Sequence, residues 1–264
     1  MSQNKDQNIS IIIVNYNNAK YLKKSLNSAL NQSYNFKEII VVDDISNDNS
    51  IEILKKYKKK IKYYVNKKKT KYGSYNQINS YYEGFKKSKG KYIFFLDSDD
   101  YFAKNKVKLV IKKFNQLSSK NILFDLPIIK TKKKSIKNNF IQKNFYFSNW
   151  PRFTPQSCIT VERNYAKKIF ETLRFKKFPT IWFDFRIASL CFINFGNIII
   201  FRKYLTYYRQ LDNSASKKFK TFSFNWWKRR NEAHAFYSYI SKRLKIKNRL
   251  TLDKIITSIV NLFI

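Results

Sequence analysis

Four short apolar runs alternate with three amphipathic segments in the first hundred residues, and this alternation limits the folds open to the chain. The apolar runs, rich in Ile, Val, Phe and Tyr as buried strands are, span residues 9–14, 38–42, 61–65 and 91–96. The segments between them carry apolar residues at helical spacing and span 19–32, 47–57 and 74–88. Such alternation predicts parallel strands joined by crossover helices. We therefore expect an α/β protein with a mostly parallel, Rossmann-like central sheet flanked by helices.

The second half of the chain has a less regular pattern. Helices are expected at 107–117 and 164–173, and strands at 121–129, 157–161, 197–201 and 205–208. Residues 130–144 are expected to form a basic, polar connection, either a flexible loop or an irregular hairpin. From about residue 222 the chain becomes helical in pattern, aromatic and basic. The expected organisation is one domain over 1–215, with halves 1–102 and 103–215, followed by a helical C-terminal extension over 216–264.

The charge of the chain is strongly positive. The formal net charge is +37, from 54 Lys and Arg against 17 Asp and Glu. Of the basic residues 44 are Lys and only 10 are Arg. This Lys bias suits an AT-rich genome better than the selection of Arg for phosphate and base recognition. No nucleic-acid partner is therefore expected, whereas peripheral attraction to an anionic membrane is reasonable.

Several classes of protein are excluded by what the sequence lacks. No run of eighteen apolar residues is present, and the first ten residues do not resemble a secretory signal. Two isolated cysteines and one histidine exclude a disulfide framework and a Cys- or His-rich metal site. We expect a cytoplasmic protein, with the inner face of the cytoplasmic membrane as a site of peripheral contact.

The scarce acidic residues are clustered. Six of the seventeen are Asp43, Asp44, Asp48, Asp97, Asp99 and Asp100. Both clusters follow predicted strands, as does the polar turn that begins with Asn15 and Tyr16. Ligands of open α/β sheets bind beyond the carboxyl ends of the strands. We therefore expect these three loops to form one crevice.

The run Asp97-Ser98-Asp99-Asp100 suits a hard divalent cation. Mg²⁺ or Mn²⁺ held by one or two carboxylates completes its coordination with water and substrate phosphates. Such an ion offsets the negative charge that develops on a diphosphate leaving group. A turn that only caps a helix is the alternative use of these carboxylates.

With these motifs in place, the sequence resembles the inverting family 2 glycosyltransferases of the GT-A fold. The matching segments, in chain order, are 10–17 (SIIIVNYN), 28–32 (SALNQ), 38–44 (EIIVVDD), 46–50 (SNDNS), 89–100 (KGKYIFFLDSDD) and 207–214 (YYRQLDNS). The resemblance is close over the first hundred residues and intermittent after them. It implies that the domain over 1–215 binds a nucleotide-sugar in its first half and an acceptor in its second.

The resemblance also implies roles for individual residues. Asn15, Tyr16 and Asp43 or Asp44 would form the wall that binds the nucleobase. Asp97 would meet the ribose and Asp99 would bind Mn²⁺ or Mg²⁺. The remaining donor-binding positions would be Ser98, Asp100 and Arg209.

Two departures from the family pattern concern the base and the donor. The family's catalytic base usually lies in an acidic pair before a helix, and here the candidate is Asp184, preceded by Phe183. A buried ion pair with Arg186 or another cation is the structural alternative for Asp184. Tyr81 and Tyr82 stand where the family commonly carries Arg-Asn, so Lys71 or Arg209 would have to contact the donor. The one histidine, His234, is expected on a surface or already hydrogen-bonded.

We therefore expect an inverting, metal-assisted transferase that moves one sugar from a nucleoside-diphosphate-sugar to a glycan or lipid-linked saccharide. A nucleotidyltransferase is the first alternative, although that class usually has a Gly-rich loop after its first strand. A non-catalytic nucleic-acid-binding protein is the second alternative, but it leaves the carboxylate clusters unexplained. A degenerate glycosyltransferase that acts only as a partner is the third.

Overall fold

The computed structural model describes residues 8–35, 37–117, 121–137, 147–211 and 218–264. Its first half has the predicted alternation of strands and helices. The elements are β1 (Ile9–Asn15), α1 (Ala19–Leu30), β2 (Lys37–Asp43), α2 (Ser50–Tyr57), β3 (Lys62–Val65), α3 (Gly73–Lys87) and β4 (Tyr92–Asp97). Each predicted element up to residue 96 is confirmed to within three residues at either end.

The second half contains both expected and unexpected elements. They are β5 (Tyr101–Phe102), α4 (Lys106–Gln116), β6 (Ile122–Lys130), β7 (Ser135–Lys137), a 3₁₀ turn (Gln156–Cys158), β8 (Ile159–Glu162), α5 (Arg163–Leu173), α6 (Phe183–Phe195), β9 (Ile200–Arg209), α7 (Phe224–Arg243) and α8 (Leu252–Val260). The prediction of separate strands at 197–201 and 205–208 is wrong, because β9 runs through both. The predicted connection over 130–144 contains β7, and its residues from 138 lie outside the described part, as does the expected domain boundary at 215.

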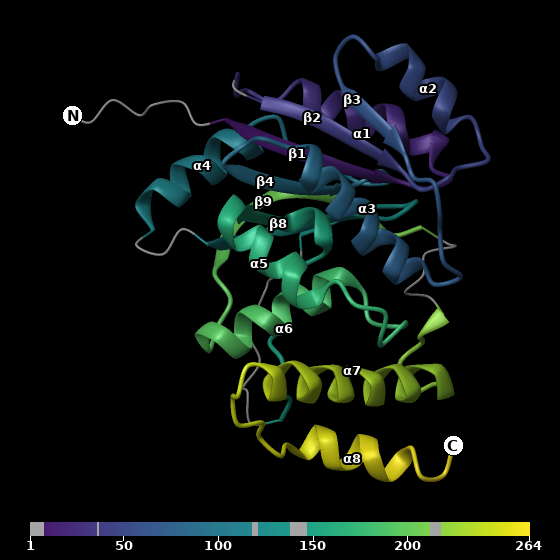
Figure 1. Cartoon of the computed structure of the whole chain (residues 1–264), viewed down its shortest axis with the longest axis vertical. Helices are drawn as coiled ribbons and strands as arrows, with labels where there is room; N and C mark the ends of the chain where they lie inside the picture. The colour runs from purple at the N-terminus through teal and green to yellow at the C-terminus, as the bar shows by residue number, and fades with distance from the viewer. Residues whose placement is uncertain (1–7, 36, 118–120, 138–146, 212–217) are drawn as a thin grey trace.

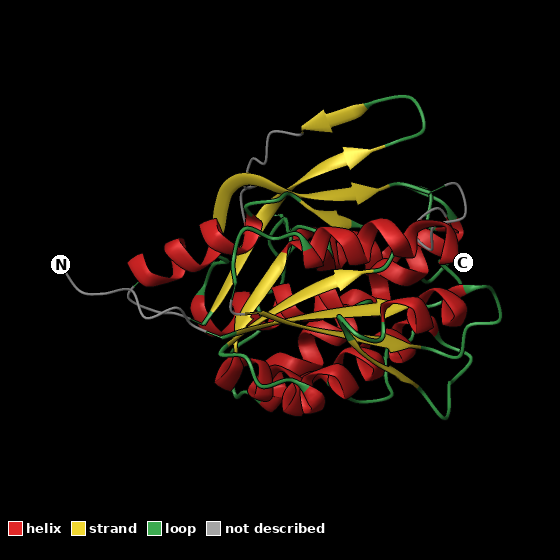
Figure 2. Cartoon of the chain, turned by 90° about the horizontal axis from the view of Figure 1, so that it is seen from above, coloured by secondary structure: helices red, strands yellow, loops and turns green. Residues whose placement is uncertain are grey.

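All strands belong to one curled sheet of order β3-β2-β1-β4-β8-β6-β9-β5, with β7 paired to β6. β3, β2, β1 and β4 are parallel neighbours. β8 is antiparallel to both β4 and β6, so the sheet becomes mixed in its second half. The expected α/β architecture is confirmed: the sheet is the central layer and helices flank it (Figures 1 and 2).

The alternation of side chains along β1 explains why the sheet is covered on both faces. Ile11 and Ile13 lie in an apolar cluster with residues of α1, α2 and α4. Ile12 and Val14 lie in a second cluster with residues of α3, α5, α6 and α7. Gly84 of α3 permits close approach there, because a Cβ atom at this position would lie 2.4 Å from Ile12 Cγ2.

The C-terminal helices form the layer farthest from α2 (Figure 1). α7 contributes the fully buried Phe236 and Ile240 to the second apolar cluster, so it covers the core. α8 lies beyond α7 and packs on it. Across the described residues, none of the helices is long and apolar enough to cross a membrane.

Candidate active site

The carboxyl ends of three neighbouring strands bring the predicted polar residues together. β1 pairs Asn15 with Asp43 of β2, and it pairs Val14 with Asp97 of β4. Asn15, Asp43 and Asp97 therefore lie side by side at one edge of the sheet, as the sequence predicted.

Asp43 is enclosed by hydrogen bonds from its own neighbourhood. Its Oδ2 accepts from Asn15 Nδ2 at 2.7 Å and from Ser46 Oγ at 2.7 Å, and its Oδ1 accepts from the Ser46 amide at 2.8 Å. The side chain is fully buried. These bonds make Asp43 a brace for the loop after β2.

Asp44 has a more open arrangement. Its Oδ1 accepts from Asn66 Nδ2 at 2.9 Å, and burial raises its pKa. The nearby Lys69 opposes this shift, and its Nζ also lies 4.8 Å from the centre of the Tyr16 ring. Tyr16 itself is 48% exposed. Of the two carboxylates in this loop, Asp44 is the one that lies beside an exposed aromatic ring and a cation.

Asp97 is held by two side chains of α3, neither of which the sequence predicted as a partner of this carboxylate. Gln77 Nε2 donates to its Oδ1 at 3.1 Å, and the Tyr81 hydroxyl donates to the same oxygen at 2.8 Å. Burial and the negative charge of Asp99 raise the pKa of Asp97 to about 7. Tyr81 thus occupies the place of the family's Arg-Asn with a neutral donor for this carboxylate.

Asp100 is fixed by the second half of the sheet. Its Oδ2 accepts from Ser157 Oγ at 2.7 Å, and its Oδ1 accepts from the Arg209 amide at 2.9 Å. Ser157 is itself anchored, because its carbonyl accepts from the buried Lys106 Nζ at 2.6 Å. Lys106 also forms a fully buried ion pair with Asp125 at 2.7 Å. Burial, together with the charge of Asp99, raises the pKa of Asp100 well above its ordinary value.

Asp99 is the carboxylate of this run that accepts no hydrogen bond from another described residue. Burial raises its pKa, and the charge of Arg209 opposes that shift. The Arg209 guanidinium donates to the Asp99 carbonyl and lies over the rings of Tyr21 and Tyr101, 5.0 and 4.7 Å from their centres. Asp99 therefore has carboxylate oxygens available for a ligand beside a fixed cation.

Ser98 differs from its neighbours. It is 1% exposed, its amide donates to Val14 O at 3.0 Å, and its hydroxyl accepts from Asn18 Nδ2 at 3.1 Å. These bonds join the acidic turn to the loop after β1. Ser98 positions the loops, and its hydroxyl is already engaged by the protein.

Asp184 lies in the first turn of α6 and faces the same acidic cluster. Its Oδ1 accepts from the Phe185 amide at 2.8 Å, and its negative charge contributes to the raised pKa of Asp97. Burial raises the pKa of Asp184 itself, while the charge of Arg229 on α7 opposes the shift. Burial and the charges of all four carboxylates raise the pKa of Tyr208 on β9.

The structure does not pair Asp184 with Arg186, although Arg229 is a second cation whose charge acts on Asp184. Arg186 is fully buried, and its guanidinium donates to the carbonyls of Ile181, Leu173, Lys177 and Phe178. It therefore organises the loop before α6 and makes no ion pair with Asp184. His234 is buried, and its Nε2 lies 3.3 Å from Asp253 Oδ2.

The donor set suits a divalent cation that is shared with a substrate. No three His, Cys, Asp or Glu side chains within the described ranges are arranged to hold a metal by themselves. Mg²⁺ and Mn²⁺ need only one or two carboxylates when phosphate oxygens and water supply the rest. Burial raises the pKa values of Asp97, Asp99, Asp100 and Asp184, and the charges of Arg209 and Arg229 only partly oppose this, which leaves a deficit of positive charge. A cation bound through Asp99 fits this deficit.

This deficit predicts that the unliganded protein gains stability as the pH falls from about 8 to 5. The pKa of Asp97 is about 7 in the folded state, against about 3.9 in an unfolded chain. Between these values the folded state binds more protons, so the free energy of unfolding decreases as the pH rises. The shift is worth no more than about 4 kcal/mol. Thermal melts in EDTA at four pH values measure the slope, which Asp97→Asn should reduce. A melting temperature that rises with pH in this range would contradict the prediction.

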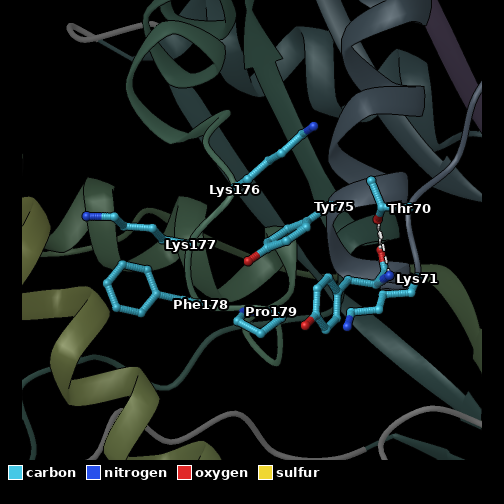
Figure 3. A pocket seen from close by; sticks show the side chains of 8 residues that line it. Thr70, Lys71, Tyr75, Lys176, Lys177, Phe178 and Pro179 are labelled. Atoms are coloured by element: carbon cyan, nitrogen blue, oxygen red, sulfur yellow. Dashed lines mark hydrogen bonds between the residues drawn. The ribbon is translucent and has the colours of Figure 1, made fainter.

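A pocket lies beside the segment that leads into α6 (Figure 3). Its volume is about 500 Å³, and its lining residues are Thr70, Lys71, Tyr72, Tyr75, Lys176, Lys177, Phe178 and Pro179. Ser74 Oγ donates to Pro179 O at 2.6 Å, and a Cβ atom on Gly73 would lie 3.1 Å from the Trp182 ring. Trp182 directly precedes α6, so the pocket is adjacent to the turn that carries Asp184. Lys71, one of the two cations expected at the donor, lines this pocket.

Five contributors to the site were missed at the level of sequence: Gln77, Tyr81, Ser157, Tyr208 and Arg229. Gln77 and Tyr81 are four residues apart on α3, a spacing that puts them on one face and is visible in the sequence. Ser157, Tyr208 and Arg229 reach the site through contacts far apart in the chain, and no local signal marks them.

The chain matches a known family over more than half of its length. The family described as Glycosyl transferase family 2 matches residues 10–178. An uncharacterised glycosyltransferase of Nostoc sp. is 29% identical over 217 residues, which are 76% of this chain and 64% of that protein. The poly(ribitol-phosphate) β-N-acetylglucosaminyltransferase TarP of Staphylococcus aureus is 38% identical over 96 residues, 35% of this chain and 28% of that protein. The chain thus spans less than two thirds of the length of these relatives.

Solved structures share the fold. The structure of S. aureus TarS residues 1–349 in complex with UDP matches with a TM-score of 0.61 and 18% identity, covering 87% of this chain and 65% of that one. The same protein in complex with UDP-GlcNAc matches with a TM-score of 0.59 and 19% identity, covering 87% and 66%. These likenesses support the expected GT-A architecture.

Proposed function

This chain belongs to glycosyl transferase family 2, and from that premise we propose that it transfers one sugar from a nucleoside-diphosphate-sugar to a glycan or lipid-linked saccharide, with inversion. One observation carries the proposal. Asp97, Asp99, Asp100 and Asp184 meet at the carboxyl ends of the strands and the first turn of α6, and burial raises the pKa of each. A concentration of carboxylates with too little positive charge suits a cation and a diphosphate.

The donor is a UDP-sugar in this proposal, by analogy with the UDP and UDP-GlcNAc complexes of TarS. Tyr16 offers an exposed ring on which a base can stack, and Asp44 can accept from a base N–H. Arg209 and Lys69 supply positive charge near the phosphates. Asp43 and Ser98 keep these loops in position and do not contact the donor.

Mn²⁺ or Mg²⁺ bound at Asp99 would offset the negative charge that develops on the leaving diphosphate. Asp184 accepts the proton of the acceptor hydroxyl as its oxygen attacks the anomeric carbon. The bond to the diphosphate breaks on the opposite face, and its electron pair leaves with the diphosphate. Burial raises the pKa of Asp184, which makes it a stronger base than an exposed carboxylate.

The acceptor approaches from the pocket of Figure 3 in this proposal. The rings of Tyr75 and Phe178 can stack on a sugar, and Lys71, Lys176 and Lys177 suit phosphate groups on the acceptor. The names of TarP and TarS specify a poly(ribitol-phosphate) acceptor, which has this chemistry. We extend only the class to this chain: a saccharide or polyol that carries phosphate. Peripheral contact with an anionic membrane is also part of the proposal.

Family membership favours this reading over a nucleotidyltransferase or a nucleic-acid-binding protein. A degenerate glycosyltransferase, which would bind no donor, is the alternative that an experiment must distinguish from an active transferase. The donor test serves this purpose directly.

We predict that UDP with Mn²⁺ raises the melting temperature of the protein, and that GDP, dTDP and CDP do so less. A ligand that binds only the folded state stabilises it in proportion to occupancy, by about 2.7 kcal/mol at a hundred times its Kd. Tyr16→Ala should weaken UDP binding about tenfold, since base stacking contributes roughly 1–3 kcal/mol. Tyr57→Ala serves as the control, because Tyr57 lies at the end of α2, remote from the site. No shift with any nucleotide, despite a cooperative melt, would refute the donor site.

A further inference from the structure

α8 is oriented with its polar side toward the protein and its apolar side outward. Its buried residues are Asp253 and Thr257, which are 3% and 0% exposed. Six large apolar residues of the helix and of the short segment that follows it are exposed: Leu252, Ile255, Ile256, Ile259, Leu262 and Phe263. A helix that covers a protein core normally has the opposite arrangement. We call these six residues the outer face of α8.

Specific contacts fix this orientation. Asp253 accepts from Arg230 Nε at 2.5 Å and from Ser148 Oγ at 2.9 Å, and its Oδ2 lies 3.3 Å from His234 Nε2. These neighbours outweigh burial and hold the pKa of Asp253 below its ordinary value. Near the other end of the helix, Asn261 Nδ2 donates to Trp227 O at 3.2 Å. Rotation of α8 to hide its apolar residues would break these bonds and leave the Arg230 charge without its partner. The outer face is therefore held away from the core.

The charge around the outer face has a single sign. Residues 218–264 include eleven Lys and Arg but only two acids, Glu232 and Asp253. Glu232 accepts from the Thr180 amide and hydroxyl, and Asp253 is buried in its own pair. The exposed Lys245, Lys247 and Arg249 immediately precede α8. The surface beside the outer face is thus cationic without neutralising carboxylates.

We propose that the outer face of α8 inserts into the interfacial region of an anionic lipid bilayer. An apolar stripe flanked by Lys and Arg is what binds this region, because the side chains enter the acyl boundary while the cations meet the headgroups. A second copy of the chain fits the surface less well, since two molecules of net charge +37 would repel each other. Rows of phosphate headgroups complement the same charge. The inference rests on the proposed function only in that a lipid-linked acceptor would be presented at the surface that α8 binds.

Co-flotation of the whole chain with vesicles tests the proposal. Vesicles of phosphatidylcholine with about 30% phosphatidylglycerol should carry the protein at about 0.15 M salt, and pure phosphatidylcholine should carry less of it. Ile255→Ser with Ile259→Ser should reduce the partition coefficient about tenfold or more without changing the charge. Lys112→Glu on the exposed side of α4 lowers the net charge by two and should retain most of the binding.

UDP binding is measured by thermal shift on the same samples. Failure of this inference can then be distinguished from failure of the proposed function. Loss of flotation in the Ile double variant with UDP binding intact supports the outer face as the lipid contact. Absence of flotation for the parent chain, with UDP binding present, overturns the inference together with the proposed membrane contact and leaves the proposed sugar transfer standing. A dimer in solution that the Ile double variant dissociates, without flotation, would also overturn it in favour of self-association.

Discussion

Asp99→Asn should lower the rate of sugar transfer about a thousandfold while leaving the protein folded. Asp99 is the one carboxylate of the turn after β4 that accepts no hydrogen bond from another described residue, so its oxygens are available to a cation. Its raised pKa shows that the negative charge is unfavourable in the unliganded protein, because burial penalises it. Removal of that charge should leave the melting temperature unchanged or raise it. The rate of UDP release and the melting temperature are measured on the same preparation.

The control for Asp99→Asn is Glu171→Gln, which removes an exposed carboxylate that pairs with Lys167 on the same helix, α5. Its rate should equal that of the parent. Stabilisation by UDP should depend on Mn²⁺ in the parent and lose that dependence in Asp99→Asn. If Asp99→Asn transfers sugar at the parent rate, then neither Asp99 nor a cation bound to it takes part in the reaction.

Asp184→Asn should lower kcat about a thousandfold with little change in donor affinity. The amide side chain is close to isosteric and can still accept from the Phe185 amide, so the first turn of α6 should remain intact. The Asn side chain cannot, however, accept a proton from the acceptor hydroxyl. Measurement of kcat, KM for the donor and UDP affinity separates this result from a binding defect.

The pH dependence distinguishes a catalytic from a structural Asp184. Burial raises its pKa, so kcat of the parent should increase with pH through that value and then level off. The residual rate of Asp184→Asn should lack this step. Equal losses of UDP affinity and rate, accompanied by a fall in melting temperature, would instead assign Asp184 a structural role.

The sequence predicted the first half of the fold well because its signals are local. β1, β2 and β4 are continuous apolar runs, and the helices between them keep helical spacing. A parallel arrangement then requires the polar ends of these strands to meet at one edge. The sequence alone therefore predicts that Asn15, Asp43 and Asp97 lie together.

The second half was harder because its elements depend on distant partners. β9 contains the exposed pair Arg202 and Lys203, and its pairing with β6 shifts register near that point. Such an irregularity interrupts the apolar pattern, so the sequence predicts two strands where the structure has one. In the sequence, Tyr81 cannot be distinguished from an ordinary core aromatic residue. Only the packing of α3 against β4 shows that its hydroxyl reaches Asp97.

The local sequence pattern also could not predict the roles of the individual acidic residues. Asp43 and Asp44 are adjacent and equivalent in the sequence, yet one is enclosed by Asn15 and Ser46 while the other lies near Lys69. The charge of Arg229 acts on Asp184 only because α7 packs against α6. These distinctions arise from tertiary packing and determine which carboxylates a substrate can meet.

The central claim is that the carboxylate cluster cleaves a nucleotide-sugar, and NMR of the donor tests it most directly. UDP-α-GlcNAc is incubated with the protein and Mn²⁺, with water as a slow acceptor, and phosphorus and proton spectra are recorded over time. The account predicts that UDP is released, that the first free sugar is the β-anomer, and that Asp99→Asn and Asp184→Asn release almost none. An intact donor under conditions in which UDP binds, or equal release by both variants, would contradict the account.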